Sequence, residues 1–209
     1  MLRNDIKEFL KTIPNGVNLV AATKYLSKEE MRELYDNGVK DYGENRVDSF
    51  LEKYDYLIKY KDIKWHFIGH LQRNKAKQVV NKIDYLHSLD SLELARIIEK
   101  ERTTPLKIFV EVSINLEESK NGVPYYELSS FLKELLKFQK IELVGLMMMA
   151  VKGSLDTKEQ FHKLRVLRDK MEKEFKIKIP YLSMGMSDDY QEAILEGATH
   201  IRLGRILYK

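Results

Sequence analysis

Short apolar runs alternate along the chain with longer segments in which apolar residues recur every three or four positions. The short runs have the length of strands buried on both faces, and the longer segments have the period of helices with one apolar face. After an opening helix over 2–12, eight such units follow one another. The expected strands are 18–24, 39–42, 65–68, 85–87, 106–113, 143–149, 181–183 and 200–203. The expected helices between them are 28–37, 44–57, 73–80, 91–102, 128–136, 156–175 and 187–197.

Residues at the starts of several helices support these boundaries. A serine or an aspartate followed three residues later by glutamate predicts a capping box, in which each side chain binds the other residue's backbone amide. Ser187 is expected to cap the helix that ends at Gly197. Capping boxes are expected at Ser27 with Glu30, Asp90 with Glu93, and Asp156 with Glu159.

The repeated strand and helix units, with no visible linker between them, predict a closed (β/α)8 barrel. Eight parallel strands can close on themselves and leave no exposed edge. The chain has 209 residues, so residues 1–209 are expected to form a single α/β domain, a TIM barrel with one extra N-terminal helix. An open, doubly wound sheet is the alternative. The glycines match neither the dinucleotide-binding pattern G-x-G-x-x-G nor the phosphate-loop pattern G-x-x-x-x-G-K-[ST].

Composition and charge exclude several classes of function. No apolar stretch has the length of a membrane span, and the N-terminal residues lack the apolar core of a signal peptide, so a cytoplasmic protein is expected. The chain has no cysteine, and its five histidines form no helical metal-binding pair, so no metal site is expected. The net charge of +4 comes from interspersed charges, and therefore neither nucleic acid nor membrane is an expected partner.

The apolar run 18–24 ends on Lys24, which is the first candidate for chemistry. The carboxyl ends of parallel strands form the rim where α/β barrels place their reactive groups. A partly buried lysine at this rim has a lowered pKa and can act as a neutral nucleophile toward an aldehyde. The alternative is a lysine that only extends from the strand end into solvent.

The segment 183–189 and Gly204, which follow the last two strands, predict a phosphate-binding corner. Loops after the seventh and eighth strands of barrels commonly bind phosphate through backbone amides and a helix N-terminus. The Ser187 hydroxyl and the Gly204 amide are the candidate donors, although Ser187 can also serve only as a helix cap. Asp188 and Asp189 oppose this interpretation, because carboxylates repel an anion unless they turn away.

A reactive lysine beside a phosphate site predicts an aldehyde ligand that carries a phosphate, and pyridoxal phosphate is the commonest such cofactor. Arg202 then has a role beside the pyridine nitrogen, where its guanidinium stays charged and donates a hydrogen bond. The alternative for Arg202 is an ion pair at the barrel rim.

Eight ordered motifs extend over nearly the whole chain: AATK (21–24), GENRV (43–47), WHFIGHLQRNK (65–75), HSLDS (87–91), SKNG (119–122), GLM (145–147), SMGMSDD (183–189) and IRLG (201–204). In these motifs the chain resembles the pyridoxal phosphate homeostasis protein family. The resemblance implies a barrel of the alanine racemase type, with Lys24 forming the internal aldimine and Arg202 meeting the pyridine nitrogen. It further implies that Ser187 and Gly204 hold the phosphate. The implied neighbours of the cofactor ring are Asn45 and Met184.

The chain departs from the family pattern at its end. Arg205 occupies a position often held by a small or hydroxyl residue, and Lys209 replaces a frequent glycine. His66 is expected to be a hydrogen-bonded core histidine, with a place in the pocket as the alternative. The basic run from Lys75 to Lys82 is expected to be solvated, with an anionic partner as the alternative.

Two functions follow from the resemblance. The first is an intracellular protein that stores, buffers or delivers pyridoxal phosphate, with apo-enzymes and amino acids as further partners. The second is an amino-acid racemase, which needs two bases on opposite faces of the substrate. The related racemases supply one of these bases from an added β domain. The few residues after Leu203 are too short for such a domain, so it is not expected here. A monomeric carrier that is not an enzyme is therefore the expectation, although weak turnover of the racemase type is not excluded.

Overall fold

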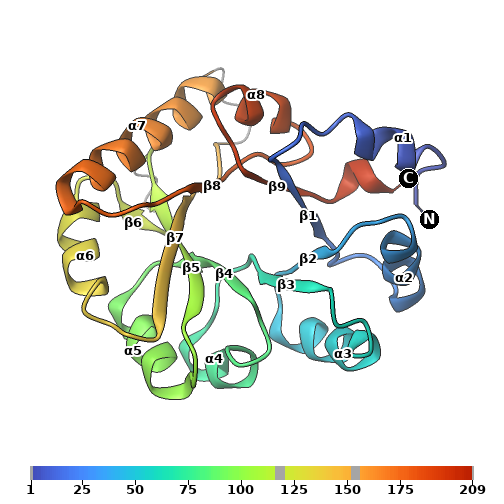
Figure 1. Cartoon of the computed structure of the whole chain (residues 1–209), viewed down its shortest axis with the longest axis horizontal. Helices are drawn as coiled ribbons and strands as arrows, with labels where there is room; N and C mark the ends of the chain where they lie inside the picture. Colours follow the sequence, from blue (N-terminus) through green and yellow to red (C-terminus); the bar gives the residue numbers. More distant parts are fainter. Residues whose placement is uncertain (1, 116–120, 152–155, 209) are drawn as a thin grey trace.

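The computed structural model describes residues 2–115, 121–151 and 156–208. Within these ranges, eight parallel strands form a closed barrel, and the helices form a ring around it (Figure 1). The barrel strands are β1 (Asn18–Ala22), β2 (Asp41–Glu44), β3 (Lys64–Phe67), β4 (Tyr85–Leu89), β5 (Leu106–Ser113), β7 (Ile141–Met147), β8 (Tyr181–Ser183) and β9 (His200–Leu203). The short β6 (Val123–Pro124) pairs with β5 beside the barrel.

The strands follow the order β4-β3-β2-β1-β9-β8-β7-β5, and the pairing of β4 with β5 closes the barrel. Closure rules out the open, doubly wound sheet and confirms the predicted α/β barrel. The two ends of the described chain meet outside the barrel, where Leu2 forms an antiparallel bridge with Tyr208. This bridge fixes the backbone immediately after the last strand.

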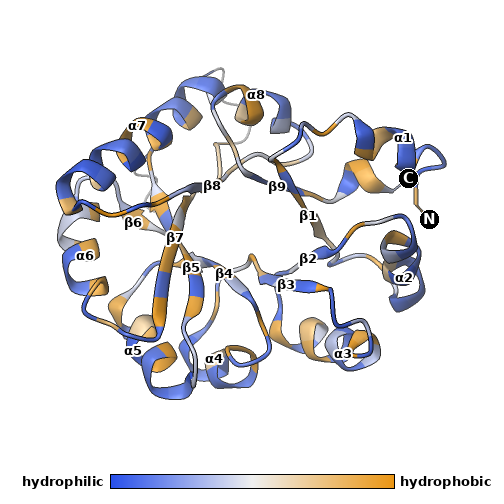
Figure 2. Cartoon of the chain, viewed as in Figure 1, coloured by the Kyte–Doolittle hydropathy of each residue, from blue (hydrophilic) through white to orange (hydrophobic). Residues whose placement is uncertain are grey.

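Amphipathic helices cover the outside of the barrel. Figure 2 shows blue and orange stretches alternating along the helical ring, as expected for helices with one apolar face. Their buried residues pack on the strands in one continuous hydrophobic cluster. The helices are α1 (Ile6–Lys11), α2 (Lys28–Asp36), α3 (Val47–Leu57), α4 (Arg73–Val79), α5 (Leu92–Glu101), α6 (Leu128–Leu135), α7 (Thr157–Phe175) and α8 (Tyr190–Leu195), followed by the 3-10 turn η1 (Arg205–Leu207).

Most elements lie where the hydrophobic pattern predicts them, and β5 and β9 have the predicted bounds. Two strands are displaced by two residues: β2 begins at 41 rather than 39, and β7 at 141 rather than 143. The pattern misplaced β2 because its buried end carries the polar residue Glu44, which an apolar run does not include. The short β6 was not predicted and lies in the expected loop.

The capping predictions are only partly right. Ser27 and Glu30 form the predicted capping box at α2. At α5 the prediction of Asp90 as the capping residue is wrong. The N-cap is Ser91, whose backbone is extended and whose hydroxyl accepts from the Leu94 N–H at 3.4 Å. Asp156 precedes α7 as its N-cap residue, but its side chain makes none of the cap hydrogen bonds.

Aromatic and imidazole rings fill the inside of the barrel. The Phe109 ring stacks on His87 with the ring centres 4.2 Å apart, and it contacts the edge of His200 at 5.1 Å. On the other side, His66 stacks on Tyr85 at 4.5 Å. The interior is therefore a packed core, and the open space lies at its rim.

Candidate functional site

Four of the six predicted site residues meet at one cavity on the carboxyl side of the barrel. Lys24 follows β1, Ser187 follows β8, Arg202 belongs to β9, and Gly204 comes directly after β9. Together they line a cavity of about 580 Å³. Small-molecule sites in proteins commonly have volumes of roughly 300 to 1,000 Å³. The structure therefore brings the predicted lysine, phosphate donors and arginine to one ligand-sized space.

Lys24 is more exposed than the sequence suggests. Strand β1 ends at Ala22, so Lys24 lies two residues further along in a turn, and its side chain is exposed. Its Nζ lies 4.8 Å from the centre of the Tyr25 ring, which is itself 70% exposed. The amine is thus held on the cavity wall, accessible to a ligand from solvent.

A buried ion pair, which the sequence analysis missed, anchors the residue before this lysine. Lys53 Nζ donates to the Thr23 carbonyl at 2.6 Å and to Glu44 Oε1 at 2.7 Å. The Thr23 hydroxyl also donates to Glu44 Oε1, at 2.5 Å. Glu44 and Thr23 are fully buried and Lys53 is 7% exposed. The pair fixes the start of the Lys24 turn from beneath, and its signal in the sequence is a lysine on the apolar face of α3.

Ser187 does not cap α8, contrary to the prediction. The N-cap of α8 is Asp189, whose Oδ1 accepts from the Met186 N–H at 2.6 Å. The Ser187 hydroxyl instead accepts from the N–H groups of Gly204 and Ile206, both at the long distance of 3.4 Å. Ser187 therefore joins the loops after β8 and β9, and its long hydrogen bonds leave it able to rearrange toward a ligand.

Both acidic residues of this loop line the cavity, and each carboxylate has a hydrogen-bond partner in the loops around it. Asp188 Oδ2 accepts from Arg205 Nη2 at 2.5 Å on the exposed rim. Asp189 bonds the backbone of its own turn. Burial raises the pKa of Asp189, although the Met186 N–H and the charge of Arg202 oppose the shift. The repulsion that the sequence predicts between these carboxylates and an anion is reduced by this geometry.

The Arg202 guanidinium is buried at the floor of the cavity. It is 5% exposed, and Nη1 donates to Ser183 Oγ at 2.6 Å while Nη2 donates to the Met148 carbonyl at 2.9 Å. Burial lowers the pKa of Arg202 to about 10, and the carboxylates of Glu111 and Asp189 oppose the shift. Arg202 therefore remains a cation at neutral pH, in one fixed orientation.

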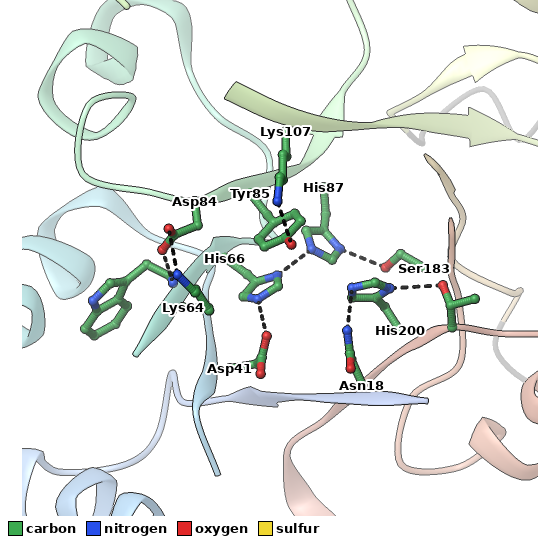
Figure 3. Close-up of polar contacts among 12 residues, drawn as sticks. Asn18, Asp41, Lys64, His66, Asp84, Tyr85, His87, Lys107, Ser183 and His200 are labelled. Carbon is green, nitrogen blue, oxygen red and sulfur yellow. Dashed lines mark hydrogen bonds and ion pairs between the residues drawn. The ribbon is translucent and has the colours of Figure 1, made fainter. Parts of the chain in front are cut away.

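A chain of hydrogen bonds runs from Ser183, which accepts from Arg202, across the barrel to Asp41 at the start of β2. Figure 3 shows this chain from Ser183 onward. Ser183 Oγ lies 2.8 Å from His87 Nδ1, His87 Nε2 lies 2.8 Å from His66 Nδ1, and His66 Nε2 lies 2.9 Å from Asp41 Oδ1. All of these contacts can be hydrogen bonds at the same time if each group donates to the next one along the chain, from Arg202 to Asp41. The structure confirms His66 as a hydrogen-bonded core histidine, and it adds His87 and Ser183, which the sequence analysis did not select.

The imidazoles of His87 and His200 are held neutral. Burial lowers the pKa of His87 well below its ordinary value, and the neighbouring His66, His200 and Arg202, which disfavour a proton there, add to the shift. Burial likewise lowers the pKa of His200 to about 3; His66 and Arg202 add to the shift and Asp41 opposes it. A neutral His87 can accept from Ser183 and donate to His66, which keeps Ser183 oriented toward Arg202.

The buried His200 predicts a dependence of stability on pH. Below pH ~6.5 the unfolded chain takes up protons that the native His200 cannot, so stability present above pH ~6.5 is lost as the pH falls toward 3. When the pH is lowered from 7 to 4.5, the free energy of unfolding should decrease by about 2 kcal/mol less in His200→Gln than in the parent. Urea unfolding at the two pH values measures the difference.

The exposed residue Asn74 on α4 supplies the control, because it has no titratable group and Asn74→Ala should show the pH dependence of the parent. Burial also raises the pKa of Glu111 to about 7, which removes stability as the pH rises from about 4.5 to 7. That effect is common to all three proteins and cancels in the comparison. Parallel curves for His200→Gln and the parent would contradict a buried, neutral His200.

Glu111 is a second buried charge near the cavity floor that the sequence analysis missed. Its side chain is 4% exposed. Burial raises its pKa, the charge of Asp90 adds to the increase, and the charge of Arg202 opposes it. The only signal in the sequence is a glutamate within the apolar run 106–113. Glu111 partly balances the Arg202 charge inside the barrel.

Asn45 and Met184 are not among the described residues that line the Lys24 cavity. Met184 is fully buried in the core. Asn45 Oδ1 is buried and has no hydrogen-bond partner among the described residues. A Cβ atom on Gly69 would lie 2.4 Å from the Asn45 carbonyl oxygen, so only glycine allows this close approach. The contact of Asn45 and Met184 with a cofactor ring stays a prediction.

Three sequence predictions concern features outside this cavity. Along the described ranges, no helix combines the length and apolar character needed to cross a membrane. The same ranges hold no group of three or more histidine, aspartate or glutamate side chains placed to bind one metal ion. Lys209 and the first half of the SKNG motif, residues 119 and 120, lie outside the described residues.

Comparison with known proteins agrees with this architecture. The family model of the alanine racemase N-terminal domain matches residues 2–209. A pyridoxal phosphate homeostasis protein of Aquifex aeolicus is 40% identical over 199 residues, which cover 93% of this chain and 87% of that protein. The alanine racemase of Corynebacterium glutamicum shares the fold, with a TM-score of 0.76 at 14% identity, and the match covers 97% of this chain and 58% of the racemase.

The PipY protein of Synechococcus elongatus has been solved both without and with pyridoxal phosphate. The form without the cofactor has a TM-score of 0.94 at 31% identity and is covered over 100% of both chains. The form with pyridoxal phosphate bound has a TM-score of 0.89, covering 98% of this chain and 100% of that chain. By its sequence and its fold, the chain belongs to the alanine racemase N-terminal domain family and, within it, to the pyridoxal phosphate homeostasis proteins.

Proposed function

We propose that this protein binds pyridoxal 5'-phosphate and takes part in its storage, buffering or delivery inside the cell. The observation that carries the proposal is the meeting of Lys24, Ser187, Arg202 and Gly204 around one cavity of about 580 Å³. The naming of the Aquifex relative and the PipY structure with pyridoxal phosphate bound support the same ligand.

The residues around the cavity fit the chemistry of this cofactor. An aldehyde needs an accessible amine, and Lys24 is exposed at the cavity wall. A phosphate needs hydrogen-bond donors close to the backbone, and Gly204 leaves space there, because a Cβ atom at this position would lie 3.3 Å from the Tyr208 hydroxyl. A pyridine nitrogen needs a donor, and Arg202 is a fixed cation in the cavity floor.

When bound, pyridoxal phosphate supplies an aldehyde that condenses with a lysine amine with loss of water. Lys24 Nζ is the amine assigned to this bond. Ser187 and the Gly204 N–H are assigned to the phosphate. Arg202 donates a hydrogen bond toward the pyridine nitrogen, and its pKa of about 10 means that it does not hand over its proton at neutral pH. An arginine in this place weakens the electron sink that many reactions at an α-carbon require.

A carrier and a racemase are separated by proton exchange at the α-carbon. With L-alanine in deuterium oxide, we expect the protein loaded with pyridoxal phosphate to produce no D-alanine and no deuterated alanine at rates near the ~1 per second typical of enzymes. The physical reason is that Arg202 disfavours carbanion formation. Chiral chromatography and mass spectrometry measure both products.

An authentic alanine racemase, loaded in the same way, is the positive control for this assay. Rapid formation of deuterated D-alanine by the protein would overturn the carrier assignment and support the racemase instead. Release of the cofactor to apo-enzymes, a cytoplasmic location and a monomeric state stay predictions from the sequence.

A further inference from the structure

Tyr208 is a cavity residue that the assignments above leave without a role. It follows η1 and lines the same cavity as Lys24 and Ser187. Its hydroxyl oxygen is buried and has no hydrogen-bond partner among the described residues. Burying a hydroxyl without a partner costs roughly 1 to 3 kcal/mol, so such a group in a ligand cavity indicates a partner supplied by the ligand.

The backbone holds Tyr208 in place beside the phosphate corner. Tyr208 forms the antiparallel bridge with Leu2, and the Arg3 N–H donates to the Leu207 carbonyl at 3.1 Å. The hydroxyl lies 3.3 Å from the point where a Cβ atom on Gly204 would stand. The Tyr208 hydroxyl therefore faces Gly204, whose N–H and the Ser187 hydroxyl together form the predicted phosphate corner.

The Tyr208 hydroxyl shares its cavity with the Lys24 amine and the Gly204 backbone, and the partner that we expect for it is a hydrogen-bond acceptor on the ligand. Burial and the nearby Tyr25 raise the pKa of Tyr208, so its hydroxyl keeps its proton at neutral pH and can donate it to an acceptor. Arg205 of η1, whose charge opposes this shift, directs its guanidinium to Asp188 at 2.5 Å on the rim. The Tyr208 hydroxyl is thus available as a donor at a position that Arg205 does not fill.

We propose that the Tyr208 hydroxyl donates a hydrogen bond to the phosphate of bound pyridoxal phosphate and so makes the protein select the phosphorylated cofactor over unphosphorylated pyridoxal. This inference rests on the proposed function and adds a phosphate contact at a residue outside the motifs of the family. Hydrogen bonds to a charged acceptor are stronger than those between neutral groups, so the loss of this one should weaken binding measurably.

The test compares the dissociation constants of pyridoxal phosphate and pyridoxal for the parent and for Tyr208→Phe. The phenylalanine keeps the ring and its packing and removes only the hydroxyl. We expect pyridoxal phosphate to bind Tyr208→Phe about 10-fold more weakly or worse. Pyridoxal should bind the variant and the parent equally, because it carries no phosphate. Tyr126→Phe, at a 62% exposed tyrosine outside the cavity, is the matched control and should bind both ligands as the parent does.

Each other outcome overturns the inference. Equal affinity of parent and Tyr208→Phe for pyridoxal phosphate would show that the hydroxyl does not contact the phosphate. An equal loss of affinity for both ligands would show that the variant disturbs the cavity in general. In either case the parent still binds the cofactor and the proposed function stands, whereas a parent that binds neither ligand would overturn both.

Discussion

Replacing Lys24 with alanine is expected to abolish covalent attachment of pyridoxal phosphate while the barrel stays folded. The side chain of Lys24 is exposed and its amine lies over the exposed Tyr25 ring, so its removal takes little packing from the core. The parent, incubated with pyridoxal phosphate, should show the visible absorbance of an imine, and the variant should show that of the free aldehyde. Absorbance spectra of the two proteins after removal of unbound ligand measure the effect.

Lys28→Ala is the matched control for this prediction. Lys28 is a neighbouring lysine on α2 that pairs with Glu52 at 2.8 Å, and it is not among the described residues of the cavity wall. It should retain the spectrum of the parent. An imine spectrum that persists unchanged in Lys24→Ala would mean that another lysine carries the cofactor.

The second large effect concerns the buried pair beneath the Lys24 turn. Lys53→Met should lower the free energy of unfolding by about 3 kcal/mol or more, because it leaves the carboxylate of Glu44 buried without its cation. Glu44 is fully buried and accepts from both Lys53 and Thr23. Methionine has nearly the length of lysine, so the loss comes from the charge. Equilibrium unfolding in urea measures it.

Two further variants define the cause of that loss. Glu44→Gln combined with Lys53→Met removes both charges and should recover part of the stability. Lys137→Met breaks an exposed pair with Glu134, at 2.7 Å, and should cost little, because water screens exposed pairs. If Lys53→Met cost no more than Lys137→Met, the buried pair would not hold the turn.

Periodicity alone was sufficient to predict the barrel. Strands such as β5 and β9 are nearly all buried, so their apolar runs mark their bounds in the sequence. The capping box at Ser27 is a local interaction over four residues and was predicted correctly. Closure followed from the number of units, because eight parallel strands can satisfy every edge.

Interactions between distant segments could not be predicted in this way. Ser183 meets His87 across the barrel although 96 residues separate them, and no local pattern marks that contact. The place of Glu44 in a buried strand could not be predicted, because a buried carboxylate needs a partner from another element. Here the partner is Lys53 of α3. Ser187 was assigned to a helix cap because local chemistry favours that role, whereas the structure joins it to Gly204.

The covalent bond to Lys24 is tested most directly by trapping it in the parent. The full chain is saturated with pyridoxal phosphate, reduced with borohydride, digested and mapped by mass spectrometry. We predict one modified peptide, with the reduced pyridoxyl phosphate group on Lys24. Modification of a different lysine, or no modification at all, would contradict the assignment.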